Sequence, residues 1–232
     1  SHELRSPVTS LIGFIETLRG PARDDAAARD RFLGIMATEA GRMNRLVGDL
    51  LSLSRVEAEA RVRPTTRVSL IEILQATLRN LNPLAVDNDV VLKPDFEPHQ
   101  IVLLGDADQL LQVFTNLVEN AIKYGGSDQT VTITSEVLER DPALRGPAVR
   151  VSVQDQGPGI DPLHLPRLTE RFYRADSHRS RALGGTGLGL AIVKHIINRH
   201  RGRLMIASEL GAGAVFTIVL PLEPETEDAG PS

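Results

Sequence analysis

The feature that most constrains this chain is a change in the spacing of its apolar residues. Along the first part of the chain they recur every three or four positions, which is the spacing of one face of an α-helix. Gly20 and Pro21 interrupt the pattern, so the sequence predicts two helices, over residues 6–19 and 31–57. After a polar stretch at 58–67, short runs of alternating apolar and polar residues, typical of strands, are interspersed with runs of helical spacing. The sequence therefore predicts an antiparallel helical hairpin, a linker and an α+β domain.

Each helix of the predicted hairpin carries a long apolar stripe. In the first helix the stripe consists of Val8, Leu11, Ile12, Ile15 and Leu18. A hairpin by itself cannot bury two such stripes, whereas a homodimeric four-helix bundle can. We favour the dimer over the alternative, in which the stripes pack against the rest of the same chain. Pro7 fits the first turn of a helix that begins beside it and would kink a helix that begins upstream.

The second domain is predicted over residues 68–222, and the acidic tail at 223–232 is expected to be disordered. Its helices are expected at 69–81 with Ser69 as the N-cap, from Asp106 or Asp108 to 124, and at 188–199. Its strands are expected at 90–92, 101–104, 130–138, 148–155, 203–207 and 214–220. Residues 156–187 are predicted to form a long loop with one helical piece.

The composition argues against several classes of protein. The net charge of -4 gives no reason to expect nucleic-acid binding, and the lack of cysteine excludes disulfides and thiolate metal sites. No apolar run approaches the roughly 18 residues that a membrane helix needs, and the first residues do not resemble a signal peptide. Because the chain begins at Ser1 without a methionine, we expect a fragment of a longer protein.

The first motif with a chemical implication is FTNLVENAIKYGG, residues 114–126. Asn116 and Asn120 are four positions apart and share one helix face, although asparagine is a mediocre helix former. Their carbonyl oxygens could hold Mg²⁺, which binds few protein oxygens together with phosphates and water. Lys123 could meet a phosphate, and Tyr124 could lie against a planar base. The alternative is a solvated helix face with chance asparagines.

A glycine-rich stretch, DQGPGI, follows at residues 155–160. Gly157 and Gly159 permit a tight backbone path and the close approach of a ligand. Asp155, at the end of a predicted strand, could accept a hydrogen bond from the exocyclic amine of adenine. Taken alone, the stretch is more simply an ordinary Gly-Pro turn.

A second glycine-rich stretch, GGTGLGLAIVKHI at residues 184–196, leads directly into a helix, whose first N–H groups can bind an anion. Its glycine spacing is not that of a dinucleotide-binding fold, and no strand precedes it. A P-loop is excluded because no Gly-Lys-Ser/Thr follows. Just upstream, Arg171 and Arg174 could reach phosphates, which favours a phosphate-binding lid over a plain surface loop.

The chain opens with SHELRSPVTSLIG, residues 1–13, in which His2 stands beside Glu3. Alone, such a pair is most simply a solvated surface pair. In the order HELRSP, NLVENAIKY, DQGPGI, RFYR and GTGLGL, however, the chain resembles the bacterial sensor histidine kinases of two-component signalling. These stretches correspond to the H, N, G1, F and G2 boxes of that family, and the resemblance extends to about Leu222. The opening residues resemble its phosphate-regulon sensor subgroup.

The resemblance implies roles for the opening residues. His2 would be the phosphoacceptor that attacks the γ-phosphate of ATP, with Glu3 as its general base. Ser6 occupies the position that the family links to phosphatase activity, where threonine or asparagine is usual. Serine keeps a hydroxyl but lacks the methyl group that restricts the rotamers of threonine. The other histidines lack matching neighbours and are expected to be surface or structural residues.

The resemblance also implies an α/β-sandwich ATP-binding domain of the gyrase, Hsp90 and histidine-kinase type. The residues that would bind ATP are Asn116, Asn120, Lys123, Tyr124, Asp155, Gly157, Gly159, Arg174, Gly185, Thr186, Gly187, Leu188 and Gly189. Of these, Asn116 and Asn120 would hold Mg²⁺ against the phosphates.

The function that the resemblance implies is that of a sensor histidine kinase core. The chain would phosphorylate His2 from Mg-ATP, pass the phosphoryl group to an aspartate of a response-regulator receiver domain, and could also dephosphorylate that regulator. It would be a homodimer and the cytoplasmic domain of a protein anchored in the inner membrane by upstream segments. The alternatives are a gyrase-like or chaperone-like ATPase, a catalytically silent dimeric scaffold, and an anti-sigma serine kinase. The hairpin with its histidine-containing start argues against the first and the last.

Overall fold

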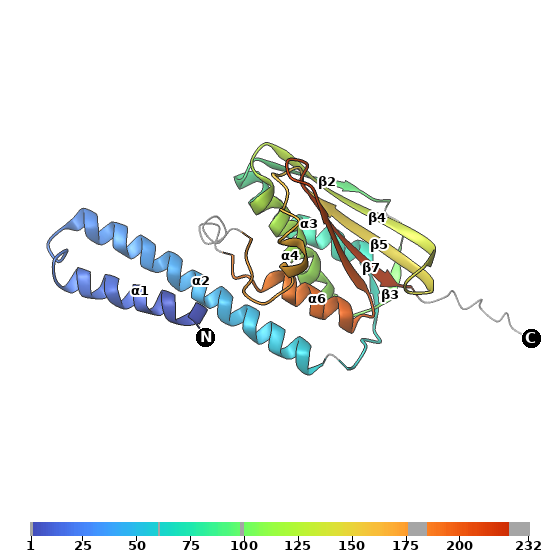
Figure 1. Ribbon diagram of the computed structural model, residues 1–232, viewed down its shortest axis with the longest axis horizontal. Coiled ribbons are helices and arrows are strands. Elements are labelled where there is room, and N and C mark those ends of the chain that lie inside the picture. The colour runs from blue at the N-terminus through green and yellow to red at the C-terminus, as the bar shows by residue number, and fades with distance from the viewer. Residues whose placement is uncertain (1, 60, 98–99, 176–184, 223–232) are drawn as a thin grey trace, which may run out of the picture.

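Two long helices open the chain and form the predicted hairpin. The computed structural model describes residues 2–59, 61–97, 100–175 and 185–222, with side chains from Pro7 on. The helices are α1 (His2–Arg19) and α2 (Ala26–Ala58). The hairpin extends away from the rest of the molecule, while the C-terminal half of α2 lies along a C-terminal α/β domain (Figure 1).

Both hairpin helices begin earlier than the sequence indicated. α1 starts at His2, so Pro7 lies inside it and removes one helical hydrogen bond. α2 starts five residues before the predicted 31–57 because Asp25 caps it: its Oδ1 accepts the N–H of Ala28 at 2.9 Å. The alanines that follow the cap are strong helix formers, which extends the helix through a stretch that the sequence suggested was loop.

The C-terminal domain is built on a five-stranded sheet in the order β2-β4-β5-β7-β6. Its strands are β2 (Val90–Asp95), β4 (Gln129–Asp141), β5 (Gly146–Gln154), β6 (Arg203–Ser208) and β7 (Ala214–Pro221). β2 and β4 are parallel, and the other neighbours are antiparallel. Burial alternates along the first part of β4, because one face of the sheet is covered.

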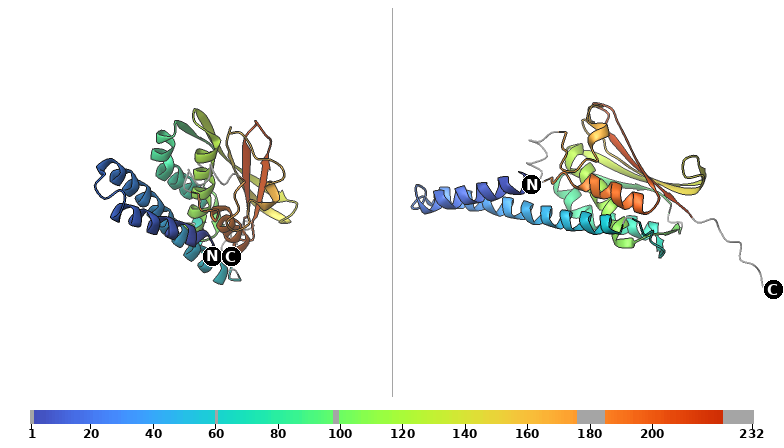
Figure 2. Two further views of the ribbon diagram at one scale, coloured as in Figure 1. Left: turned by 60° about the vertical axis from the view of Figure 1, so that its left-hand side comes forward. Right: turned by 60° about the horizontal axis from the view of Figure 1, so that its bottom comes forward.

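Helices α3 (Leu70–Asp87), α4 (Ala107–Gly125) and α6 (Gly189–Arg199) cover that face (Figures 1 and 2). Ser69 caps α3 as predicted, since its side chain accepts the N–H of Glu72. Of the two candidate caps for α4, Asp106 is the one that accepts an N–H, from Gln109 at 3.1 Å. The predicted α/β sandwich is confirmed, with the side chain of Phe114 fully buried in its core.

Some elements of the C-terminal domain differ from the prediction. A short strand, β1 (Arg67–Ser69), pairs with β3 (Val102–Leu104). The sequence suggested that the linker ended where β1 begins, because three residues are too few to show the apolar–polar alternation of a strand. α3 continues through Pro83 to Asp87. The described part of the predicted loop at 156–187 contains a 3-10 helix, η1 (Leu165–Arg167). Residues 176–184 and the predicted tail at 223–232 lie outside the described residues.

The C-terminal half of α2 packs on the C-terminal domain along what we call the α2 seam. Leu46, Leu53 and Val56 lie on one face of α2, are at most 2% exposed, and belong to the same core cluster as the helices and sheet of the domain. Part of the apolar stripe is therefore buried within the same chain, which was the less favoured alternative. The apolar hairpin residues that remain between 39% and 67% exposed include Val8, Ile12, Ile15, Val47 and Leu51.

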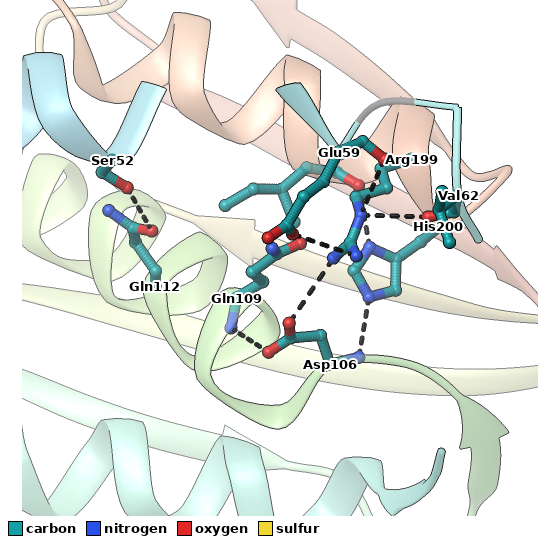
Figure 3. Close-up of polar contacts among 9 residues, drawn as sticks. Ser52, Glu59, Val62, Asp106, Gln109, Gln112, Arg199 and His200 are labelled. Atoms are coloured by element: carbon teal, nitrogen blue, oxygen red, sulfur yellow. Dashed lines mark hydrogen bonds and ion pairs between the residues drawn. The ribbon is translucent and has the colours of Figure 1, made fainter. Parts of the chain in front are cut away.

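Polar side chains also bridge the α2 seam. Ser52 Oγ donates to Gln112 Oε1 of α4 at 2.9 Å (Figure 3). Further along α2, Glu57 forms an ion pair with Arg171, and its Oε1 lies 3.3 Å from Nε2 of His195 on α6. These contacts attach three segments of the C-terminal domain to α2.

At the C-terminal end of α2, the seam ends in a cluster of polar contacts around Arg199 (Figure 3). Arg199 Nε donates to the carbonyl oxygens of Glu59 and Val62 at 3.3 and 3.1 Å. The Arg199 guanidinium also lies 3.0 Å from the Glu59 carboxylate and 3.4 Å from that of Asp106. His200 is 1% exposed, and its Nε2 accepts the N–H of Asp106 at 3.0 Å. The residues that follow α2 are thus bound to the ends of α4 and α6. Within the described ranges, no helix combines the length and hydropathy needed to cross a membrane.

Candidate functional site

A cavity of about 630 Å³ lies among α4, the loop after β5, the start of α6 and α2. This volume is in the range of ordinary small-molecule sites. The cavity brings together most of the residues predicted to bind ATP: Asn116, Asn120, Lys123, Tyr124, Asp155, Gly159, Arg174, Gly185, Thr186, Gly187 and Gly189. Gly157 and Leu188, which were also predicted, do not line it. Leu188 is fully buried, and Gly157 packs against the backbone of Gly125.

One wall of the cavity is the polar face of α4. Asn116, Glu119, Asn120 and Lys123 reach it together because they are spaced three and four residues apart on one helix. The Lys123 ammonium pairs with the Glu119 carboxylate. Asn116 Nδ2 is buried without a hydrogen-bond partner among the described residues. Since an amide presents either its nitrogen or its oxygen after a half-turn, this group can meet a phosphate or a cation, so the wall fits Mg²⁺ and phosphates.

Asp155 also lines the cavity, directly after β5. Its Oδ1 accepts the backbone N–H groups of Gly157 and Ala214 at 2.9 and 3.2 Å. Burial raises the pKa of Asp155 above its usual range, and the two backbone hydrogen bonds oppose that shift. With Oδ1 engaged, Oδ2 is the oxygen available to accept a hydrogen bond from a ligand.

Two glycines allow the backbone to turn and pack closely along the wall of the cavity. Gly159 has φ +73, and a Cβ placed on it would lie 2.0 Å from the carbonyl oxygen of Glu209. Gly187 has φ +74, and a Cβ there would lie 2.9 Å from the backbone of Phe172. Both positions therefore require glycine, for conformation and for space. The same turn brings the Phe172 N–H to the Gly187 carbonyl at 2.8 Å.

The segment before residues 176–184 contributes further polar groups to the cavity, among them His164, which the sequence did not single out as a site residue. Tyr173 Oη and His164 Nδ1 are 2.6 Å apart, and both residues line the cavity. His164 was expected to be a surface or structural residue. Arg174 Nη2 donates to the Thr186 carbonyl at 3.1 Å, which connects this segment to the start of α6.

The cavity has one wall that the sequence did not indicate at all, formed by Arg45, Gly48 and Asp49 of α2. Asp49 Oδ2 accepts a hydrogen bond from Thr186 Oγ1 at 2.6 Å. Burial is the main reason that the pKa of Asp49 is raised; the Thr186 hydrogen bond opposes the shift and Glu119 adds to it. The two residues are 137 positions apart in the chain, and no local pattern could have paired them.

The predicted catalytic residues His2, Glu3 and Ser6 lie on the first turns of α1. Their side chains are outside the part that the structure describes. The start of α1 lies beside the middle of α2, at the end of the hairpin nearer the C-terminal domain (Figures 1 and 2). These residues therefore stand apart from the hairpin loop, at the end of the hairpin that is nearer the C-terminal domain.

Two known domain families match the chain. Residues 1–59 match the His Kinase A (phospho-acceptor) domain. Residues 105–224 match the family described as histidine kinase-, DNA gyrase B-, and HSP90-like ATPase, which is half of the chain. The first match covers the hairpin, and the second covers α4, most of the sheet and the cavity residues outside α2.

Individual relatives agree with these families. The chain is 41% identical over 217 residues to the phosphate regulon sensor protein PhoR of Pseudomonas aeruginosa, a match that covers 94% of this chain and 47% of PhoR. The chain spans about half the length of the curated relatives it matches. It shares 26% identity with histidine kinase ThkA, solved in complex with response regulator protein TrrA, with a TM-score of 0.74 over 97% of this chain and 60% of ThkA.

A second solved structure is full-length ShkA in complex with AMPPNP. It has a TM-score of 0.68 and 26% identity over 95% of this chain and 44% of ShkA. The resemblance read from the five motifs is thus confirmed by family, relatives and fold. The chain belongs to the sensor histidine kinases, with a phospho-acceptor hairpin at its start and an ATPase domain of the histidine kinase, DNA gyrase B and HSP90 type after it.

Proposed function

We propose that this chain is the catalytic core of a sensor histidine kinase, which transfers the γ-phosphoryl group of Mg-ATP to His2. One observation carries the proposal: a cavity of nucleotide size joins amides, a lysine, a carboxylate and a helix start, in a chain whose first 59 residues match a phospho-acceptor domain. The AMPPNP complex of ShkA supports the use of ATP by a related fold.

The contacts of the cavity suggest how the nucleotide would lie. Asp155 Oδ2 would accept a hydrogen bond from the adenine amine, and Tyr124 would lie against the base. At the other end, the N–H groups at the start of α6 would bind phosphates, with Lys123 close by. Asn116 and Asn120 would hold Mg²⁺, which neutralises phosphate charge when it is bound.

The proposed transfer is a single displacement at phosphorus. A ring nitrogen of His2 forms a bond to the γ-phosphorus, while the bond from that phosphorus to the β,γ-bridging oxygen breaks and ADP leaves. Glu3 takes the proton that the imidazole gives up. The phosphoryl group then passes to an aspartate of a response regulator, a partner class that the ThkA–TrrA complex supports. The Ser6 hydroxyl would orient water if the same protein dephosphorylates its regulator.

The exposed apolar residues of the hairpin support the homodimer. Val8, Ile12 and Ile15 of α1 and Leu51 of α2 are exposed in the single chain, and a second hairpin would cover them in a four-helix bundle. The PhoR relative supports phosphate-regulon signalling as the class of pathway. Attachment to an inner membrane through segments upstream of Ser1 stays a prediction.

The test is incubation with Mg²⁺ and γ-labelled ATP. The chain should acquire a label that is stable in base and lost in acid, as a phosphohistidine is, and His2→Gln should acquire none. His99→Gln, which changes a histidine outside the five motifs, is the matched control and should be labelled normally. Label that survives in His2→Gln would contradict the assignment of the acceptor. Absence of both label and ATP binding in the unaltered chain would contradict the proposed kinase.

A further inference from the structure

α2 contributes a carboxylate to the cavity at the place where phosphates are expected. Asp49 lines the cavity, and its Oδ2 accepts the Thr186 hydroxyl at 2.6 Å. Thr186 is three residues from Gly189, the first residue of α6. The carboxylate is therefore held at the entry to the helix that would bind the phosphates of the nucleotide.

The start of α6 is an attractive place for an anion. Its N-cap residue, Leu188, supplies no side-chain hydrogen bond to the first turn. The N–H groups of an uncapped first turn carry the positive end of the helix dipole and favour a negatively charged group nearby. The Leu188 N–H instead donates to Thr186 Oγ1 at 3.2 Å, and that hydroxyl in turn donates to Asp49. Asp49 is thus the anion linked to this helix start.

Charges of both signs line the cavity with Asp49, and one of the cations, Arg174, already donates to the Thr186 carbonyl. Glu119 lies close enough to Asp49 to raise its pKa, and the same carboxylate pairs with Lys123, the cation expected to meet a phosphate. Arg45 is on α2 itself and acts in the opposite sense on Asp49. A triphosphate that enters while α2 is docked would therefore meet a fixed negative charge in a partly desolvated cavity, where charge repulsion is stronger than in water.

We propose that Asp49 couples docking of α2 to nucleotide affinity: its carboxylate holds the place of an anion at the start of α6, and the phosphates of the nucleotide must displace it. The proposal rests on the proposed function, because it names how the ATP site is regulated. In the docked form the site would bind polyphosphates weakly. Binding of ATP would break the hydrogen bond between Asp49 and Thr186 and loosen the α2 seam, which would help the ATPase domain leave α2 on its way to His2.

The first test compares Asp49→Asn with the unaltered chain by calorimetric titration with ATP, ADP and adenosine. Asparagine has the same shape and still accepts the Thr186 hydroxyl, so only the charge is removed. Affinity for ATP should rise about fivefold or more, affinity for ADP should rise less, and that for adenosine should not change, because repulsion scales with phosphate charge. The control is Asp30→Asn, an acid of α2 whose side chain is 79% exposed and which is absent from the cavity lining.

A second test fixes the seam. The chain has no cysteine, so Ser52→Cys with Gln112→Cys places the only two thiols at a seam contact, where a short thiol cross-linker can hold α2 docked. Closing the cross-link should weaken ATP binding, and the weakening should shrink when Asp49→Asn is added. Thermal unfolding of each variant checks that it is folded.

The outcomes separate the two proposals. If adenosine and ATP bind the unaltered chain but Asp49→Asn binds ATP equally or more weakly, the coupling is wrong and the ATP site stands. If cross-linking leaves the ATP affinity unchanged, docking does not regulate the site. If neither the unaltered chain nor the variants bind any of the three compounds, the proposed function fails, and the coupling fails with it.

Discussion

Polar groups inside the ATPase domain and those in the middle of the α2 seam, around Asp49 and Ser52, are satisfied in different ways. Inside the domain, Asp155 accepts the backbone N–H groups of Gly157 and Ala214, and both are fixed by the chain that surrounds them. Along the seam, Ser52 and Asp49 bond to other side chains. Side chains that separate can turn to water, whereas a backbone group in a core cannot. The comparison indicates a rigid ATP site beside a contact that is built to open.

The largest effect is expected at the fixed side of the cavity, from Asp155→Asn. Asparagine keeps Oδ1 for the two backbone N–H groups but replaces the second acceptor with a donor. That donor would face the adenine amine, so adenine nucleotides should bind about 30-fold more weakly or worse, a loss of about 2 kcal/mol. Fluorescence or calorimetric titration with ADP measures the change.

Asp95→Asn is the matched control for Asp155→Asn, since Asp95 is exposed on the edge strand β2. It should bind ADP as the unaltered chain does. Thermal unfolding of Asp155→Asn should change little, because the buried hydrogen bonds remain. An unchanged affinity for ADP in a folded Asp155→Asn variant would show that this carboxylate does not contact the base.

A smaller effect is expected from the second fixed group, His200. Its Nε2 accepts the Asp106 N–H and its Nδ1 lies 2.8 Å from the Ile196 carbonyl, which together require the neutral ring with hydrogen on Nδ1. Burial lowers the pKa of His200 below its ordinary value of 6.5, Arg199 and Arg63 lower it further, and the Ile196 hydrogen bond and Asp106 oppose them.

The sign of the pH dependence follows from that lowered pKa. At a pH between the lowered pKa of the folded protein and the ordinary value of 6.5, the unfolded chain binds a proton at His200 that the folded chain does not. The neutral His200 therefore contributes its full stability above pH 6.5, and the free energy of unfolding decreases as the pH falls below that value. Urea unfolding from pH 7.5 to pH 5 measures the loss. His200→Gln should lose less stability over this range than the unaltered chain. If the free energy of unfolding depends on pH equally in both proteins, His200 is not the group that titrates.

How much the sequence predicts depends on whether the cause is local. The caps at Ser69 and Asp106 and the conformation of Gly159 follow from neighbouring residues, and the motifs mark most of the cavity lining. The earlier start of α2 is also local, since Asp25 followed by alanines is a usual helix start that the polar stretch obscured. Local signals therefore account for the elements and the ATPase side of the site.

The α2 seam could not be predicted because its cause is not local. A stripe of apolar residues on α2 fits a partner helix or the ATPase domain equally well, and the structure uses Leu46 and Leu53 for the domain while it leaves Val47 and Leu51 exposed. The pairing of Asp49 with Thr186 joins positions 137 residues apart. Only tertiary packing decides which side chains meet across such a distance.

The smallest effect is expected from a charge in the seam, by Glu57→Gln. The Glu57 side chain is 32% exposed, and its partners Arg171 and His195 are 51% and 34% exposed. Ion pairs this accessible contribute about 1 kcal/mol or less, and salt screens them. Glu57→Gln should therefore loosen docking slightly in low salt. Since Glu57 does not line the cavity, it can change ATP affinity only through docking, so that affinity should rise only slightly.

Docking can be measured as the rate at which a short cross-linker joins the thiols of Ser52→Cys and Gln112→Cys. Adding Glu57→Gln should slow this reaction in low salt, and the difference should vanish in high salt. Glu39→Gln is the control, because Glu39 pairs with Arg42 within α2 and does not bridge the seam. A slowing as large in high salt as in low salt would show that Glu57 acts by packing rather than by charge. Opening the seam would then require packed side chains to separate, as in the interior of the ATPase domain. It would cost more free energy than separating exposed ion pairs.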